Sequence, residues 1–224
     1  MTSNTFDTSD HASLPTVTPA LKWPAVFLSY LFHPIFIPLY VLLFIVYIHP
    51  SYFSGFSDGT RLRTILILVQ NAVFYPLFCV LLLKGVGFID SIFLRTRKDR
   101  IIPYIACGIF FFWTFTVFKE QGAFPRIVPA FILGVFLASS AALIANIYFK
   151  ISMHAIGLGG MLGVFLVIAS NYSMMMTWPL SIALLVTGLV CTARLLITDH
   201  SPKDIYSGLF VGIVAQFIAA YVML

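Results

Sequence analysis

The chain has 224 residues, of which 60% are hydrophobic and only 9% are charged, and its formal net charge is +5. A soluble domain of this size carries many more charges, so the composition indicates an integral membrane protein. The eight acidic residues all lie in the N-terminal tail or in gaps between apolar runs. This placement excludes a carboxylate relay in the middle of the membrane, as in ion pumps. The positive charge reflects basic loops and is no evidence for a nucleic-acid partner.

Residues 1–22 are polar and rich in serine and threonine, without the basic start or apolar core of a signal peptide, so we expect a short disordered tail. Residues 23–224 are expected to form a single membrane-embedded domain, because the gaps leave no room for a second one. The expected fold class is all-α, a polytopic bundle of about seven transmembrane helices. The apolar segments lie at about 24–48, 63–83, 101–118, 127–148, 153–171, 176–197 and 204–224.

Prolines and glycines add detail to these segments. Pro34 and Pro38 are expected to kink the first segment, and Pro103 is expected to mark the start of the third. Glycines four residues apart occur in the fifth and seventh segments, and small residues at this spacing let two helices approach closely. These are Gly159 and Gly163 in the fifth segment and Gly208 and Gly212 in the seventh.

The polar gaps alternate between two membrane faces. Side A comprises the tail, 84–100, the turn near Lys150 and the turn 198–203; side B comprises 49–62, 119–126, 172–175 and the C-terminus. Side A has eight basic residues and side B has four, which places side A in the cytoplasm by the positive-inside rule. Without Lys98, Arg100 and Lys150, which belong to a candidate anion site, the count is five against four. We expect a multi-pass protein of a bacterial-type inner or plasma membrane, with the side of the site left open.

The most informative residues are Arg194, His200 and Asp204, at the junction of the last two segments. Charged groups beside hydrocarbon are costly and need a reason to be there. Ser201 and Pro202, followed by an acid at the third helical position, predict a helix start, so His200 lies beside a positive helix end. Asp204 can orient the imidazole, and Arg194 can hold phosphate oxygens. The alternative, a structural Arg–Asp ion pair, does not need two carboxylates, a histidine and an arginine in one turn.

A second cluster, Lys150 to His154, precedes the fifth segment. Ser152 is a suitable N-cap, which places His154 in the first helical turn. The functional interpretation is that Ser152 and nearby backbone N–H groups bind phosphate while His154 protonates a leaving oxygen. The alternative is a helix cap followed by an interfacial histidine.

A third cluster, residues 95–100, has five charges in six residues before the third segment. Alone it is typical of a topology signal or a lipid-headgroup patch. Because it shares side A with the other two clusters, we expect Lys98 and Arg100 to bind phosphate. His33 and His49 are assigned to the membrane interface, and the two remaining usable histidines, without a cysteine cluster, argue against a zinc site.

Together the three clusters resemble the type 2 phosphatidic acid phosphatase (PAP2) superfamily. That family is marked by Lys-x6-Arg-Pro, Pro-Ser-Gly-His and Ser-Arg-x5-His-x3-Asp motifs, in that order, on a bundle of membrane helices. The third motif matches from Arg194 to Asp204, with Ala193 in place of its serine. The second matches at Ser152 and His154, with Ile151 and Met153 in place of proline and glycine. The first is present as Lys98, Arg100 and Pro103, at a different spacing.

The resemblance implies a metal-independent lipid phosphatase without cofactors. His200 would attack phosphorus and become a phosphohistidine, Asp204 would orient it, and His154 would protonate the leaving group. Arg194, Ser152, Lys98 and Arg100 would hold the phosphate, and we add the hypothesis that Lys150 supplies a cation that the first motif lacks. The expected substrate is a lipid phosphate or diphosphate such as phosphatidate, phosphatidylglycerophosphate, polyprenyl diphosphate or a lipid A phosphate. A phosphotransferase and a non-catalytic headgroup binder or transporter remain as alternatives.

Overall fold

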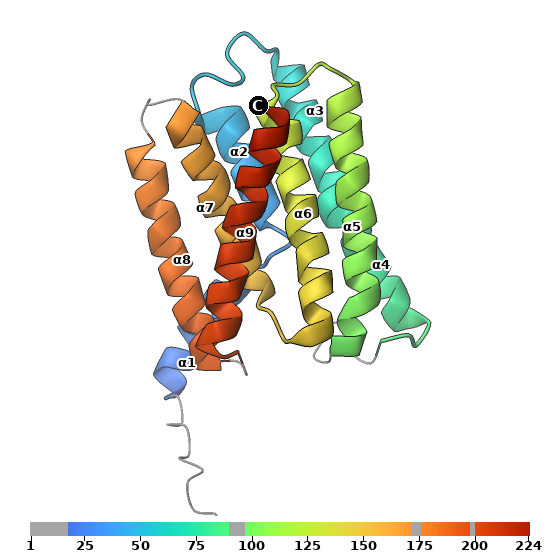
Figure 1. Ribbon diagram of the computed structural model, residues 1–224, viewed down its shortest axis with the longest axis vertical. Helices are drawn as coiled ribbons and strands as arrows, with labels where there is room; N and C mark the ends of the chain where they lie inside the picture. Colours follow the sequence, from blue (N-terminus) through green and yellow to red (C-terminus); the bar gives the residue numbers. More distant parts are fainter. Residues whose placement is uncertain (1–17, 90–96, 172–175, 198–199) are drawn as a thin grey trace, which may run out of the picture.

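The computed structural model describes residues 18–89, 97–171, 176–197 and 200–224, and in these residues all regular structure is helical (Figure 1). This confirms the predicted all-α bundle. The elements are α1 (Pro19–Leu31), α2 (Ile37–Leu43), the π-helical η1 (Phe44–Ile48), α3 (Asp58–Leu68), the π-helical η2 (Val69–Phe74), α4 (Tyr75–Gly85), α5 (Arg97–Glu120), α6 (Ile127–Tyr148), α7 (Met153–Asn171), α8 (Thr177–Ile197) and α9 (Pro202–Met223).

Six helices in the described part of the chain are long and apolar enough to cross a bilayer. One of them is the continuous helix Asp58–Gly85, in which α3, η2 and α4 follow one another without a break. The other five are α5 to α9. The protein is therefore a multi-pass membrane protein, and six of the seven expected segments correspond to spanning helices.

The first expected segment, 24–48, is not a single kinked span. It divides into α1, a break at residues 32–36, and the 12 residues of α2 and η1. At 1.5 Å per residue the second piece is about 18 Å long, well short of the roughly 30 Å of a hydrocarbon core. The break follows from Pro34, which has no N–H to donate to the carbonyl of Tyr30. The N–H of His33 donates to that carbonyl instead, at 3.2 Å.

Two other boundaries differ from expectation. α1 begins at Pro19, inside the segment expected to be a polar tail, because a proline suits the first helical position. α5 begins at Arg97 and contains Pro103, which was expected to mark the start of this helix. A proline in the second turn removes one backbone hydrogen bond without ending the helix, and the added residues give α5 a full membrane-spanning length.

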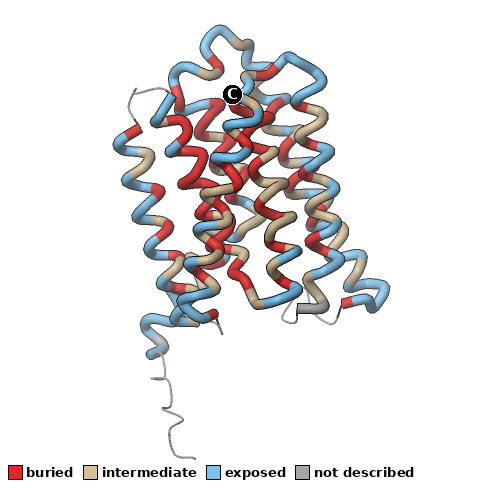
Figure 2. The backbone as a smooth tube through the Cα atoms, viewed as in Figure 1, coloured by how far each residue is buried: buried red, intermediate tan, exposed pale blue. Residues whose placement is uncertain are grey.

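The centre of the bundle is α7, most of which is buried (Figure 2). Its neighbour α9 lies against it at a separation that only glycine permits. A Cβ atom on Gly208 would come within 2.9 Å of the Ser152 carbonyl oxygen, and one on Gly163 within 2.9 Å of the Ile213 carbonyl oxygen. A Cβ on Gly212 would overlap the Ile156 carbonyl. The predicted close packing through glycines is therefore confirmed, and it is the backbones of α7 and α9 that meet.

We expect Gly212→Ala to lower the free energy of unfolding by about 1–3 kcal/mol, because the added methyl meets backbone atoms that no rotamer change can move. Gly188→Ala in α8 is the matched control, since nothing lies within 4 Å of its Cβ position. Thermal denaturation of both variants in detergent measures the difference. Equal stability of the two variants would show that the α7–α9 contact is looser than the structure has it.

Candidate active site

The start of α9 is a capping box, as the sequence predicts. The hydroxyl of Ser201 accepts from the backbone N–H of Asp204 at 3.3 Å, and the Asp204 carboxylate accepts from the backbone N–H of Ser201 at 2.9 Å. These two bonds satisfy orphan amides at the helix end and fix the Asp204 side chain in one orientation. His200 directly precedes the cap.

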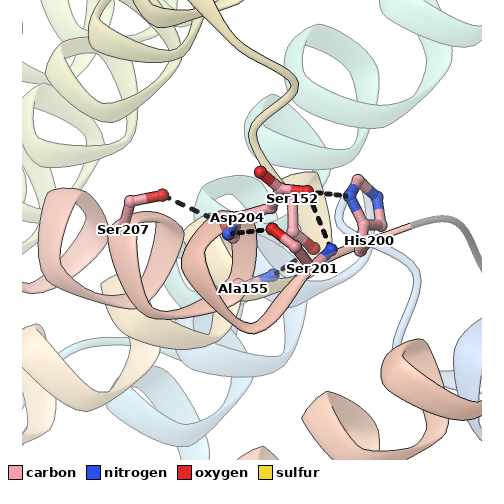
Figure 3. Close-up of polar contacts among 6 residues, drawn as sticks. All are labelled: Ser152, Ala155, His200, Ser201, Asp204 and Ser207. Atoms are coloured by element: carbon pink, nitrogen blue, oxygen red, sulfur yellow. Dashed lines mark hydrogen bonds and ion pairs between the residues drawn. The ribbon is translucent and has the colours of Figure 1, made fainter. Parts of the chain in front are cut away.

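The imidazole of His200 faces the Asp204 carboxylate, with 3.6 Å between Nδ1 and Oδ2 (Figure 3). The His200 side chain is 4% exposed and that of Asp204 is 14% exposed. At this distance the two groups are not hydrogen-bonded, and Nδ1 of His200 has no hydrogen-bond partner among the described residues. The carboxylate hydrogen-bonds to the Ser201 amide and lies beside the His200 ring, where it can act on the ring through its charge.

Three cations from different parts of the chain act on His200. Its pKa is lowered to about 4, first by burial and then by the charges of Arg194, Lys150 and Arg100, while Asp204 acts in the opposite direction. Arg100 is also within electrostatic range of Arg194. The expected meeting of the three side A clusters at one end of the bundle is thus confirmed for these residues. Lys98 belongs to the first turn of α5, but its side chain lies outside the described part of the structure.

The start of α7 is tied directly to the start of α9. The backbone N–H of Ser152 donates to the Asp204 carbonyl at 3.2 Å, and the Ser152 hydroxyl accepts from the N–H of Ala155 at 3.4 Å. Ser152 is the predicted N-cap, but it is 0% exposed. Its amide joins the two helices that contribute His154 and His200.

His154, in the first turn of α7, is buried and its Nε2 lies 3.0 Å from the carbonyl oxygen of Ser29 in α1. Arg194, His33 and His200 all lie within electrostatic range of it. The structure therefore brings His154 into the same site as His200, and it adds α1 as a contact that the sequence did not predict.

Two residues at this end of the bundle, His33 and Tyr104, were not predicted as part of the site. His33, which we assigned to the membrane interface, packs its ring edge-on against His154, with 5.7 Å between the ring centroids. Tyr104 in α5 is 4% exposed, and its hydroxyl has no hydrogen-bond partner among the described residues. One signal for His33 is present in the sequence, because it directly precedes Pro34, which was expected to kink the first segment.

No family model, curated protein or solved structure matches this chain. Within the described residues, no group of three or more histidine, cysteine or acidic side chains is arranged to hold a metal ion. The described residues of the site present a neutral imidazole beside a carboxylate, with cations acting on it. Such an arrangement suits attack on a dianionic phosphate group.

The lowered pKa of His200 predicts a pH-dependent stability. Between pH 6.5 and about 4 the unfolded chain holds a proton on this imidazole that the folded protein does not, so stability falls as the pH falls through this window. We expect His200→Gln to lose less thermal stability than the wild type between pH 7 and pH 5, measured by thermal denaturation in detergent. An equal loss in both proteins would show that His200 is not a buried neutral imidazole.

Proposed function

We propose that the protein is a metal-independent lipid phosphatase of a bacterial-type inner or plasma membrane, which hydrolyses a lipid phosphate or diphosphate monoester through a phosphohistidine. The observation that carries the proposal is the buried His200–Asp204 pair, with Arg194, Lys150 and Arg100 acting on the same imidazole. A structural ion pair at a helix junction would not need a histidine between the cations and the carboxylate. The resemblance of the three sequence clusters to the PAP2 superfamily supports the same function.

In the proposed reaction, Nε2 of His200 attacks phosphorus, because Nδ1 faces Asp204. The N–P bond forms as the bond between phosphorus and the leaving oxygen breaks, and the leaving oxygen takes a proton, a role the resemblance gives to His154. Water then attacks the phosphohistidine, inorganic phosphate leaves, and the imidazole is restored. The Asp204 carboxylate stabilises the positive charge that develops on the ring during the first step.

The cations account for the electrostatic part of catalysis. Phosphoryl transfer needs positioned positive groups around the equatorial oxygens, and such groups are most effective where water is excluded. Arg194 can bind two oxygens through its planar guanidinium. Lys150 lies two residues before the cap of α7, and its charge acts on His200. This supports its proposed role as the cation that completes the phosphate clamp, which is the set of positive side chains that holds the phosphate.

The position of the site favours a lipid substrate. Next to it, α1 exposes large apolar side chains, with Trp23 78%, Phe27 65% and Tyr30 58% exposed. Aromatic residues of this kind prefer the interface between headgroups and hydrocarbon. A phosphorylated headgroup can therefore reach His200 while its acyl or isoprenoid tail stays in the bilayer.

The first test is phosphate release by the purified protein in detergent without added metal. The substrates are phosphatidate, phosphatidylglycerophosphate, polyprenyl diphosphate and a lipid A phosphate. We expect release from at least one, reduced by about 1,000-fold or more in His200→Ala, because the nucleophile is lost. His49→Ala, on the opposite membrane face, is the control and should keep its activity.

Brief incubation with ³²P-labelled substrate, followed by alkaline denaturation, should trap label on the wild type and not on His200→Ala. Label that is trapped without phosphate release, and that moves to an added alcohol, would indicate a phosphotransferase. A folded protein that binds phospholipid but neither traps label nor releases phosphate would instead be a headgroup-binding protein.

Lys150→Ala tests the clamp. Loss of one cation that contacts phosphate should raise KM or the inhibition constant of inorganic phosphate by about tenfold, since a charged hydrogen bond contributes about 1.5–3 kcal/mol. Lys203→Ala, which removes an exposed lysine from the first turn of α9, is the matched control. Equal behaviour of the two variants would remove Lys150 from the site.

A further inference from the structure

The backbone next to the break between α1 and α2 contacts a residue of the candidate active site. Because Pro34 cannot donate to Tyr30, the N–H of His33 bonds to the Tyr30 carbonyl. In a regular helix that N–H would bond to the carbonyl of Ser29, four residues earlier. The Ser29 carbonyl thereby loses its backbone donor, and Nε2 of His154 lies 3.0 Å from its oxygen instead. Pro34 in the first segment thus determines the hydrogen-bond partner of His154 in the site.

This contact fixes the protonation of His154. A carbonyl oxygen only accepts hydrogen bonds, so Nε2 of His154 must carry the hydrogen. That hydrogen points to Ser29 and not to a ligand, so His154 cannot protonate the leaving oxygen, the role that the resemblance gives it. The leaving oxygen takes its proton from water and needs another hydrogen-bond donor as the bond to phosphorus breaks.

His33 has the properties of such a donor. Its Nδ1 accepts from the backbone N–H of Ile35 at 3.4 Å, which places the hydrogen of the neutral ring on Nε2. No described residue takes a hydrogen bond from that Nε2, and the residue keeps an exposed surface beside the buried His154. Arg194, which is expected to hold phosphate, is close enough to act together with desolvation in lowering the pKa of His33. His33 is therefore a neutral donor beside His154 and in the field of Arg194.

We propose that His33 is a third catalytic histidine, which donates a hydrogen bond from Nε2 to the leaving-group oxygen of the substrate as the bond to phosphorus breaks. The proposal rests on the proposed phosphatase function and deepens it, because it places the alcohol of the lipid against the α1–α2 break. Negative charge develops on the leaving oxygen in the transition state, and a fixed donor stabilises it there more than in the bound substrate. If the His33 ring only packed against His154, its substitution would lower kcat/KM by the same factor for substrates with different leaving groups.

The test compares two soluble monoesters, p-nitrophenyl phosphate and octyl phosphate, whose leaving groups differ widely in basicity. Each kcat/KM includes only the steps up to departure of the leaving group, so hydrolysis of the phosphohistidine does not mask the effect. In His33→Leu we expect kcat/KM for octyl phosphate to fall by about 10- to 100-fold, and that for p-nitrophenyl phosphate by less than about threefold, because its leaving group needs little help. His33→Gln, whose amide nitrogen can stand in for Nε2, should recover much of the loss.

The ratio of the two kcat/KM values does not depend on how much of a variant is folded, so partial misfolding cannot imitate the result. His49→Leu is the matched control and should leave both values unchanged. An equal loss on both substrates in His33→Leu, or no loss on either, would overturn the role of His33 while leaving the phosphatase function intact. If the wild type releases phosphate from neither monoester nor any lipid phosphate, the proposed function fails, and the role of His33 fails with it.

Discussion

The close approach of α7 to α9 is the constraint on which the site depends. The two helices meet backbone to backbone, because glycines such as Gly208 and Gly212 occupy positions where any Cβ would strike the facing chain. This separation lets the Ser152 amide reach the Asp204 carbonyl. His154 and His200, which are far apart in sequence, thereby acquire a fixed relation. A wider spacing between α7 and α9 would break the bond from Ser152 to Asp204, and the relative positions of the two imidazoles would then no longer be fixed.

The electrostatics of the site depend on the two contacts of the Asp204 carboxylate. Asp204 caps its own helix and faces His200, so its negative charge lies beside the histidine. The surrounding positive charges and the burial keep the imidazole neutral, which is the state a nucleophile needs. In the proposed function the same charges hold a phosphate dianion, so one set of residues would both bind the substrate and keep the His200 imidazole neutral.

The parts of this structure that the sequence predicts are the local ones. The capping box at Ser201, the N-cap at Ser152 and the six spanning helices can be predicted from residue type and spacing, because their hydrogen bonds close within a few residues. The contacts that escaped prediction are non-local. Pro34 signals a break, but nothing in the chain says that the open carbonyl of Ser29 will meet a histidine 125 positions away. The bond from the Ser152 amide to the Asp204 carbonyl is likewise between two helices, and no local pattern predicts it.

The pairing of α7 with α9 also sets an order of assembly. Helix α8 separates them in sequence and lies at the edge of the bundle (Figure 1), so it must cross the membrane before α9 can dock. The bond from Ser152, His200 and the Asp204 carboxylate that faces its imidazole all arrive with α9. A nascent chain that has inserted only as far as α8 therefore has Arg194 and His154 in place but lacks the His200–Asp204 pair. During synthesis the candidate site is completed in one late docking step, after the rest of the bundle is already in the bilayer.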